Sequence, residues 1–406
     1  MNLTIEQPCP QCGGPVELGE ADHVLICPYC GTKNFLSTSM PALLLPPARE
    51  YEEMIYVPYL RFRGSVFSCI GNTIQHQVTD TSLLGTPLNI LPPSLGIRPQ
   101  AMKTHFATNK LQGTFLKCLH DAGAAVERAG SLQNIMAGQT LYHRAYIGET
   151  LSLVYQPLYL KDEKLGDAIT GKLLARLKGG LSGLERVTEP APPLDLNFLA
   201  TLCPQCGWNL NCTSDSVVLT CPNCHTAWQA AEKRFSQVDC ACMGCDNKQA
   251  LYLPFWKMAV DCRGIRLENF ADFSRLANLP QKNQPDWEQR KLFLWSPAFK
   301  VRPKIFLRLA GQCSTLLEEY DGEKMIPANS HPVNLPLSEA IESLKVILAG
   351  VAANKKKLLP MLPDIRISAT SASLFYLPFD NTGYDLRQVE TGISINKQIL
   401  ARGKDL

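Results

Sequence analysis

The chain has 406 residues, of which 45% are hydrophobic and 19% are charged, and its formal net charge is +3. This composition is typical of an ordered globular protein with room for two domains, and it excludes a disordered chain. The nearly balanced charge gives no support to a protein that binds nucleic acid through a broad basic surface.

The sequence predicts a cytoplasmic protein. The N-terminal stretch MNLTIEQPCPQC has no basic segment followed by an apolar one, so we expect no secretory signal. The longest apolar runs, such as residues 346–353, are shorter than the about 20 residues that span a bilayer. The 16 cysteines are therefore expected in a reducing compartment, where Cys-x-x-Cys pairs more often hold metal than form disulfides.

The first chemical signal along the chain is a pair of Cys-x-x-Cys motifs separated by 14 residues, formed by Cys9, Cys12, Cys27 and Cys30. Each motif can direct two sulfur atoms at one ion, and two motifs complete the four-ligand shell that zinc prefers. Apolar residues between the motifs, such as Val16 and Val24, are compatible with two short strands. Proline and glycine in CPQCG and CPYCG favour the tight turns that this geometry needs.

These stretches resemble zinc ribbons of the rubredoxin-knuckle type. The resemblance implies a zinc-bound β-hairpin module and no particular activity. Iron in a rubredoxin-type site and buried free thiols are the alternatives, because tetrahedral sulfur sites suit either metal.

The rest of the first half predicts mixed structure. Residues 55–71 (IYVPYLRFRGSVFSCIG) are rich in aromatic and β-branched residues and predict a strand. Residues 164–181 predict a helix that ends at Gly179-Gly180. The proline-rich residues 189–200 predict a linker.

The second half repeats the first. Cys203, Cys206, Cys221 and Cys224 have the spacing of the first quartet, 194 residues later. Three further stretches recur in the same order: YVPY as YLPF at an offset of 196, PSLGIRPQ as PAFKVRPK at 204, and SLVYQP as SLFYLP at 221. Conserved order with growing offsets predicts a tandem duplication with loops that lengthened between retained elements.

A third group of cysteines has no counterpart in the first half. Cys240, Cys242 and Cys245 fall within six residues, and Cys262 or Cys212 could supply a fourth ligand. A third zinc site, an iron–sulfur or otherwise redox-active site, and an uncoordinated group of thiols all remain open. Downstream, residues 251–267 predict a strand and residues 337–354 an amphipathic helix.

The predicted fold class is α+β, with two pseudo-equivalent halves, each a zinc ribbon followed by a strand-rich body with one or two helices. The predicted domains are zinc ribbon 1 (1–38), body 1 (39–188), the linker (189–200), zinc ribbon 2 (201–230), and body 2 (231–406) with its cysteine-rich insert at 240–245. Two zinc ions are expected and a third is possible, with iron or an iron–sulfur cluster as the alternative at the third group.

The expected function is that of a non-enzymatic scaffold or adaptor with protein partners. The sequence contains no phosphate-binding loop, no His-Glu-x-x-His motif and no nucleophile elbow, so we assign no catalytic or cofactor-binding residue. A nucleic-acid-binding zinc-ribbon protein is the first alternative, but residues 203–228 contain no lysine or arginine to contact phosphates. A redox or metal-transfer protein that uses Cys240, Cys242 and Cys245 is the second.

Overall fold

The computed structural model describes residues 3–38, 40–96, 102–133, 135, 138–192, 194–231, 234–280, 285–317 and 322–403. The chain divides into two compact units that are interleaved in sequence. Unit 1 comprises residues 1–63, 79–132 and 149–200, and unit 2 comprises residues 64–78, 133–148 and 201–406. Two segments of the N-terminal half, residues 64–78 and 133–148, therefore belong to the compact unit of the C-terminal half.

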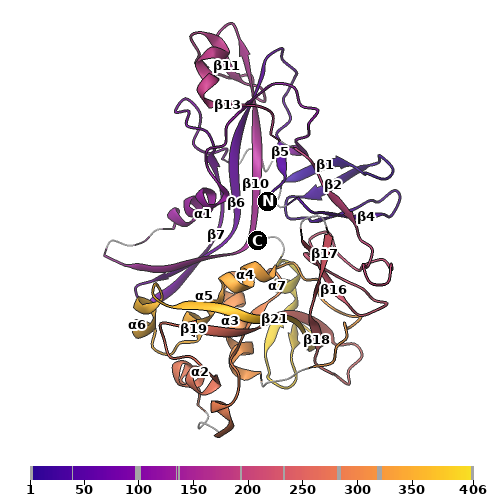
Figure 1. Cartoon of the computed structure of the whole chain (residues 1–406), viewed down its shortest axis with the longest axis vertical. Helices are drawn as coiled ribbons and strands as arrows, with labels where there is room; N and C mark the ends of the chain where they lie inside the picture. The colour runs from indigo at the N-terminus through magenta and orange to yellow at the C-terminus, as the bar shows by residue number, and fades with distance from the viewer. Residues whose placement is uncertain are drawn as a thin grey trace. The chain divides into compact units, whose positions relative to one another are not determined.

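Strands dominate the N-terminal half of the chain, coloured indigo to magenta in Figure 1. Most of them belong to one sheet with the order β13-β9-β6-β10-β5-β8-β1-β2, to which β7, β11 and β12 are attached. The strands of this sheet are β1 (Thr4–Pro8), β2 (Pro15–Gly19), β5 (Ala42–Leu44), β6 (Met54–Ile70), β7 (Thr73–Leu84), β8 (Lys103–Phe106), β9 (Thr114–Leu116), β10 (Leu141–Lys161), β11 (Lys164–Asp167), β12 (Leu173–Arg176) and β13 (Thr188–Glu189).

Three further strands form a small separate sheet with the order β14-β4-β3, and helices are few in this half. The remaining elements are β3 (Val24–Ile26), β4 (Lys33–Leu36), β14 (Phe198–Ala200), helix α1 (Ala122–Ser131) and a 3-10 helix (Gly180–Val187). Asp121 caps α1 by accepting a hydrogen bond from the amide of Ala124. β13 and β14 place both ends of the expected linker in strands of unit 1.

The C-terminal half has more helix and two sheets, one with the order β15-β16-β17 and one with the order β20-β19-β21-β22-β23, where β18 also pairs with β21. Its strands are β15 (Val218–Thr220), β16 (Ala227–Ala231), β17 (Arg234–Val238), β18 (Cys240–Cys242), β19 (Leu251–Arg263), β20 (Phe293–Pro297), β21 (Arg366–Asn381), β22 (Asp385–Arg387) and β23 (Ser394–Asn396). Its helices are α2 (Phe270–Ala277), α3 (Pro303–Leu316), α4 (Leu337–Glu342), α5 (Leu344–Val351), α6 (Lys355–Leu358) and α7 (Lys397–Ala401), with short 3-10 helices at Pro285–Glu288 and Leu359–Met361.

The core of unit 2 includes side chains from the N-terminal half. Phe67 and Ile147 are buried in the same apolar cluster as Trp256 and Phe306, and the ring centroids of Phe67 and Phe306 are 5.9 Å apart. The Glu342 carboxylate in α4 accepts a hydrogen bond of 2.8 Å from the amide of Tyr146. Residues 64–78 and 133–148 are therefore integral to this unit.

One three-strand order occurs twice. In the first half, β5 pairs in parallel with β10, which neighbours β6; in the second half, β18 pairs in parallel with β21, which neighbours β19. The partners correspond as well, with Leu153 opposite Ala42 and Leu374 opposite Cys240. These strands carry the recurring YVPY/YLPF and SLVYQP/SLFYLP stretches. Local topology thus repeats as the duplication requires, while equivalence of the complete halves stays a prediction.

Several predicted elements are confirmed and one is wrong. β6 and β19 occupy the strands predicted at 55–71 and 251–267, and α4 and α5 occupy the helix predicted at 337–354, divided only at Ser343. The helix predicted at 164–181 is absent, because this segment contains β11 and β12. The Asp167 carboxylate accepts hydrogen bonds from the amides of Ile169 and Thr170 and turns the chain there.

Arg98 and the rest of IRPQ (97–100), part of one recurring stretch, lie outside the described residues. Among the residues that are described, no helix is long and apolar enough to cross a bilayer.

Candidate metal centres

The first quartet is built from two hairpin turns. Cys9 and Cys12 lie in the turn between β1 and β2, whose last pair is Pro8 with Pro15, and Cys27 and Cys30 lie in the turn between β3 and β4. The two strands expected between the motifs are present as β2 and β3. They pair outward with β1 and β4, so each Cys-x-x-Cys motif has a hairpin of its own.

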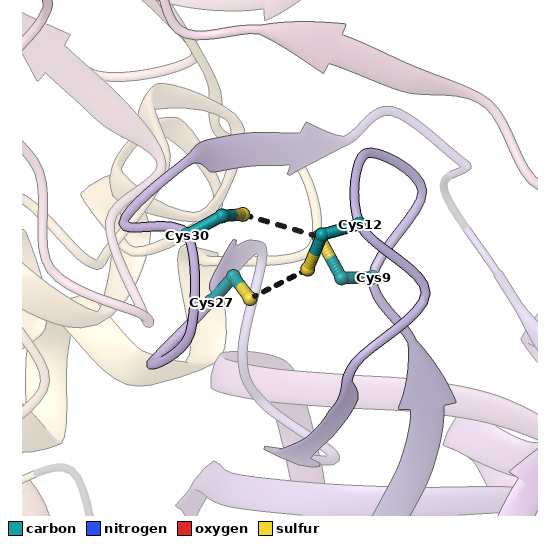
Figure 2. Close-up of side chains that lie close together, drawn as sticks. All are labelled: Cys9, Cys12, Cys27 and Cys30. Atoms are coloured by element: carbon teal, nitrogen blue, oxygen red, sulfur yellow. Dashed lines mark hydrogen bonds between the residues drawn. The ribbon is translucent and has the colours of Figure 1, made fainter.

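The four sulfur atoms of this quartet converge on one point (Figure 2). Cys9 Sγ lies 3.8 Å from Cys30 Sγ, and Cys12 Sγ lies 3.7 Å from Cys27 Sγ. Four thiolates at about 2.3 Å from a tetrahedral ion stand about 3.8 Å apart. The sulfur spacing is therefore that of a tetrahedral metal centre.

The second quartet has the same construction 194 residues later. An isolated bridge between Leu202 and Asn209 flanks the first motif, and β15 and β16 flank the second. Cys203 Sγ lies 3.6 Å from Cys224 Sγ, and Cys206 Sγ lies 3.5 Å from Cys221 Sγ. Within the described part of the chain, these two quartets are the groups of side chains that could hold a metal ion.

The backbone of the turns also matches between the quartets. The amide of Cys9 donates to the carbonyl of Gly14 at 2.8 Å, and the amide of Cys203 donates to the carbonyl of Trp208 at 2.8 Å. Gly13 and Gly207 have φ angles of 74° and 73°, in the left-handed region that favours glycine. His225 has a φ of 53° at the position that Gly31 occupies in the first quartet. It follows Cys224 as a turn residue and not as a member of the converging group.

Hydrogen bonds favour ionised sulfur in both centres. The amide of Cys12 lowers the pKa of the Cys9 thiol to about 6. Burial raises the pKa of Cys203, but the amides of Cys206 and Gln205 outweigh it and lower the value to about 6. Burial raises the pKa of Cys221 to about 12, and the neighbouring sulfurs act in the same direction. Four sulfurs this close cannot all ionise without a cation between them, which a divalent metal provides.

Sequence reasoning missed one threonine in each centre. The Thr32 hydroxyl lies 3.0 Å from Cys30 Sγ and the Thr226 hydroxyl lies 3.1 Å from Cys224 Sγ, so each can donate to a metal-bound thiolate. The Thr32 hydroxyl lowers the pKa of Cys30, and Thr226 in turn accepts a hydrogen bond from the Trp228 indole. The available signal was the recurrence of threonine two residues after the last cysteine, in CPYCGT and CPNCHT.

A buried ion pair connects the first metal module to the body of unit 1. Glu20 follows β2, and its carboxylate forms a salt bridge with Arg61 of β6 and accepts a hydrogen bond from the Ser152 hydroxyl. Arg61 also binds Asp80 at 2.8 Å and is only 2% exposed. The second module is attached differently, because its Asp215 accepts a hydrogen bond of 2.6 Å from Asn334.

The third group of cysteines does not converge on a point. Cys240 and Cys242 lie in β18 opposite Leu374 and Tyr376 of β21, and the exposed Cys245 follows them. β18 has the place in the topology that β5, with the aliphatic sequence ALL, has in the first half. Burial raises the pKa of both Cys240 and Cys242, which favours protonated thiols.

The tentative fourth ligands do not fit this group either. Cys262 lies in β19 opposite Ile367, seven residues along β21 from Leu374, which corresponds to about 23 Å of strand. Cys212 Sγ contacts the carbonyl oxygen of Leu210 instead. The four sulfurs of Cys240, Cys242, Cys245 and Cys262 thus form no ligand set in the described residues.

Comparisons of the chain with protein-family models, with curated proteins and with solved structures found no match.

Proposed function

We propose that this protein is a non-enzymatic adaptor whose two metal modules are stabilised by zinc and present surfaces to protein partners. Four thiolates fill the tetrahedral shell of zinc and leave no position for water or substrate, which is typical of structural sites. In this proposal the residues Cys9, Cys12, Cys27, Cys30, Cys203, Cys206, Cys221 and Cys224 hold the ions.

The observation that carries the proposal is an exposed aromatic ring on each module. Tyr29 is 67% exposed on the first, and Trp208 is 58% exposed on the second. They come from opposite motifs: the residue 194 positions before Trp208 is Gly14, and the residue 194 positions after Tyr29 is Asn223. A Cβ at Gly14 would lie 2.7 Å from the Tyr29 ring, so a side chain there would displace the ring from its present position.

Each module thus has one exposed ring in or beside a Cys-x-x-Cys motif, although the motif that supplies the ring differs between the modules. Retention of an exposed ring favours a contact surface, because aromatic residues are enriched at protein interfaces. Leu202 is 49% exposed and lies in the isolated bridge with Asn209, next to Trp208, where it adds apolar surface. The absence of lysine and arginine from residues 201–230 disfavours a phosphate-binding role for this surface.

The test compares partners captured by the zinc-loaded full-length protein and by variants after crosslinking in cells. We expect the recovery of at least one partner to fall about tenfold or more in Trp208→Ala or Tyr29→Ala, since central aromatic residues contribute roughly 2 kcal/mol or more to binding at interfaces. Tyr384→Ala is the matched control, because Tyr384 is 87% exposed but lies outside both modules. Equal recovery of every partner by all three variants would contradict the proposal, as would salt-sensitive binding of RNA or DNA that depends on Trp208.

A further inference from the structure

A hollow of about 440 Å³ lies in unit 2, distant in sequence from both cysteine quartets. Such a volume is within the range of small-molecule sites. Its lining combines apolar and polar side chains from β19, β21, β22, α7 and the segment around His331, and it contains no aspartate or glutamate.

One face of the six-stranded sheet supplies the apolar floor. Leu251 of β19 is directly opposite Phe379 of β21, and Asn381, two residues further along β21, is opposite Leu386 of β22. Residues that are opposite each other, or two apart on one strand, share a face of the sheet. Leu251, Phe379 and Leu386 therefore form one apolar surface that ends at Asn381, and α7 adds Leu400.

At that end, hydrogen-bond donors gather. The Lys397 ammonium donates to the Asn381 side-chain oxygen, which also accepts a hydrogen bond of 3.0 Å from the amide of Gly383. The Asn381 amide nitrogen and the remaining ammonium hydrogens are left as donors. In the described part of the chain, Lys397 has no carboxylate partner. This end of the hollow is suited to an anion.

Acceptors are supplied by the segment that contains Asn329 and His331. The Asn329 amide nitrogen donates to the carbonyl oxygens of Gln249 and Ala250, so its side-chain oxygen is left as an acceptor. His331 Nδ1 lies 2.9 Å from the carbonyl of Pro332, which can only accept, so Nδ1 carries the proton. Burial lowers the pKa of His331, against the opposing effects of the Pro332 carbonyl and Asp215, and this favours the neutral ring, in which Nε2 is an acceptor.

We propose that this hollow binds a small zwitterion with an apolar body, of the amino-acid type. Its carboxylate is held by Lys397 and Asn381, its ammonium group by Asn329 and His331, and its apolar part rests on Leu251, Leu386 and Leu400, behind which Phe379 is fully buried. The site uses none of the eight metal-binding cysteines and does not rest on the adaptor role proposed above, although the segment that carries His331 also bonds to the second module through Val333.

Isothermal titration of the full-length, zinc-loaded protein tests the site with L-leucine, L-phenylalanine and the dipeptide Leu-Leu, which together separate a free amino acid from a short peptide. We expect at least one of them to bind with a Kd below about 1 mM. For the ligand that binds, the analogue without the ammonium group (4-methylpentanoate for leucine) and the carboxamide are each expected to bind about tenfold or more weakly, because hydrogen bonds to charged groups are strong. Glycine, which lacks the apolar body, is expected not to bind.

Lys397→Met should reduce the affinity by about 10- to 100-fold and remove the preference for the acid over the carboxamide. Lys356→Met is the matched control, since Lys356 is exposed in α6 and does not line the hollow, and it should bind like the unaltered protein. The proposal is overturned if none of the three probes binds, if the carboxamide binds as well as the acid, or if both lysine variants behave alike.

Discussion

Replacing Arg61 by methionine should strongly destabilise the packing of the first metal module on the body of unit 1. The Arg61 side chain is 3% exposed and the Glu20 side chain 2% exposed, so loss of the guanidinium leaves a buried carboxylate whose remaining partner is the Ser152 hydroxyl. Removing one member of a buried ion pair costs about 3–5 kcal/mol, because the other charge stays desolvated. Burial lowers the pKa of Arg61, and its contact with Asp80 opposes that shift.

Hydrogen exchange measured by mass spectrometry on the zinc-loaded protein can follow this effect locally. Peptides covering β2 and the unit 1 part of β6 should exchange about 10²- to 10⁴-fold faster in Arg61→Met. Lys103→Met is the matched control: Lys103 binds Glu6 and Glu17 at 2.7 and 2.6 Å, but its side chain is 59% exposed. Exposed pairs contribute about 1 kcal/mol or less, so exchange there should rise less than about tenfold.

The double variant Glu20→Met/Arg61→Met removes both charges and should exchange more slowly than Arg61→Met alone, since no buried carboxylate of Glu20 is left unpaired. The reasoning is refuted if Arg61→Met and Lys103→Met accelerate exchange equally, or if the double variant is as labile as the sum of its single changes.

Three other predictions follow from the geometry. Thr226→Val should weaken zinc retention at the second centre about 10- to 100-fold in competition with a chelator, whereas Thr213→Val, whose hydroxyl contacts Asp215 and Ser216, should not. Phe67→Ala should destabilise unit 2 by about 3–5 kcal/mol, although Phe67 belongs to the N-terminal half. Urea titration followed by tryptophan fluorescence measures the unfolding of this unit, because all five tryptophans lie in residues 201–406. Burial lowers the pKa of His143 to about 4, so as the pH falls from 6.5 to 4 the unfolded chain binds this proton before the folded protein does, and the folded state loses stability. His143→Leu should therefore lose less stability over that interval than the unaltered protein. An unchanged pH dependence of stability would contradict this prediction.

The sequence predicted the two quartets well because all their information is local. Four thiol side chains at fixed spacing, with proline and glycine in the turns, determine both the ligands and the hairpins that carry them. The long strands β6 and β19 were predictable for a similar reason, since aromatic and β-branched residues are concentrated within each of them.

The missed features depend on contacts between distant residues. Glu20 and Arg61 are 41 positions apart, and nothing near either residue indicates that they meet. The same is true of Phe67 and Phe306, which is why segments 64–78 and 133–148 were not expected in unit 2. The sequence left the third cysteine group open between a metal site and uncoordinated thiols, because proximity in sequence does not make sulfur atoms converge when alternate positions of a strand hold them.

The helix predicted at 164–181 failed for a local reason. Gly166 packs so closely on Tyr159 that a Cβ there would lie 2.2 Å from the ring, and Gly171 has a φ of 72°, in the left-handed region that favours glycine. The β11–β12 hairpin needs glycine at both positions, and glycine in the interior of a helix is unfavourable, so these residues were the local signal against a helix.

X-ray absorption at the metal edge, combined with elemental analysis of protein purified without air, tests most directly whether two tetrathiolate centres hold this chain together. The account predicts two zinc ions per chain, each surrounded by four sulfur atoms at about 2.3 Å, and the same count after Cys240, Cys242 and Cys245 are all replaced by alanine. Fewer than two metal ions, nitrogen or oxygen atoms in the coordination shell, or a third ion lost with that triple replacement would contradict it.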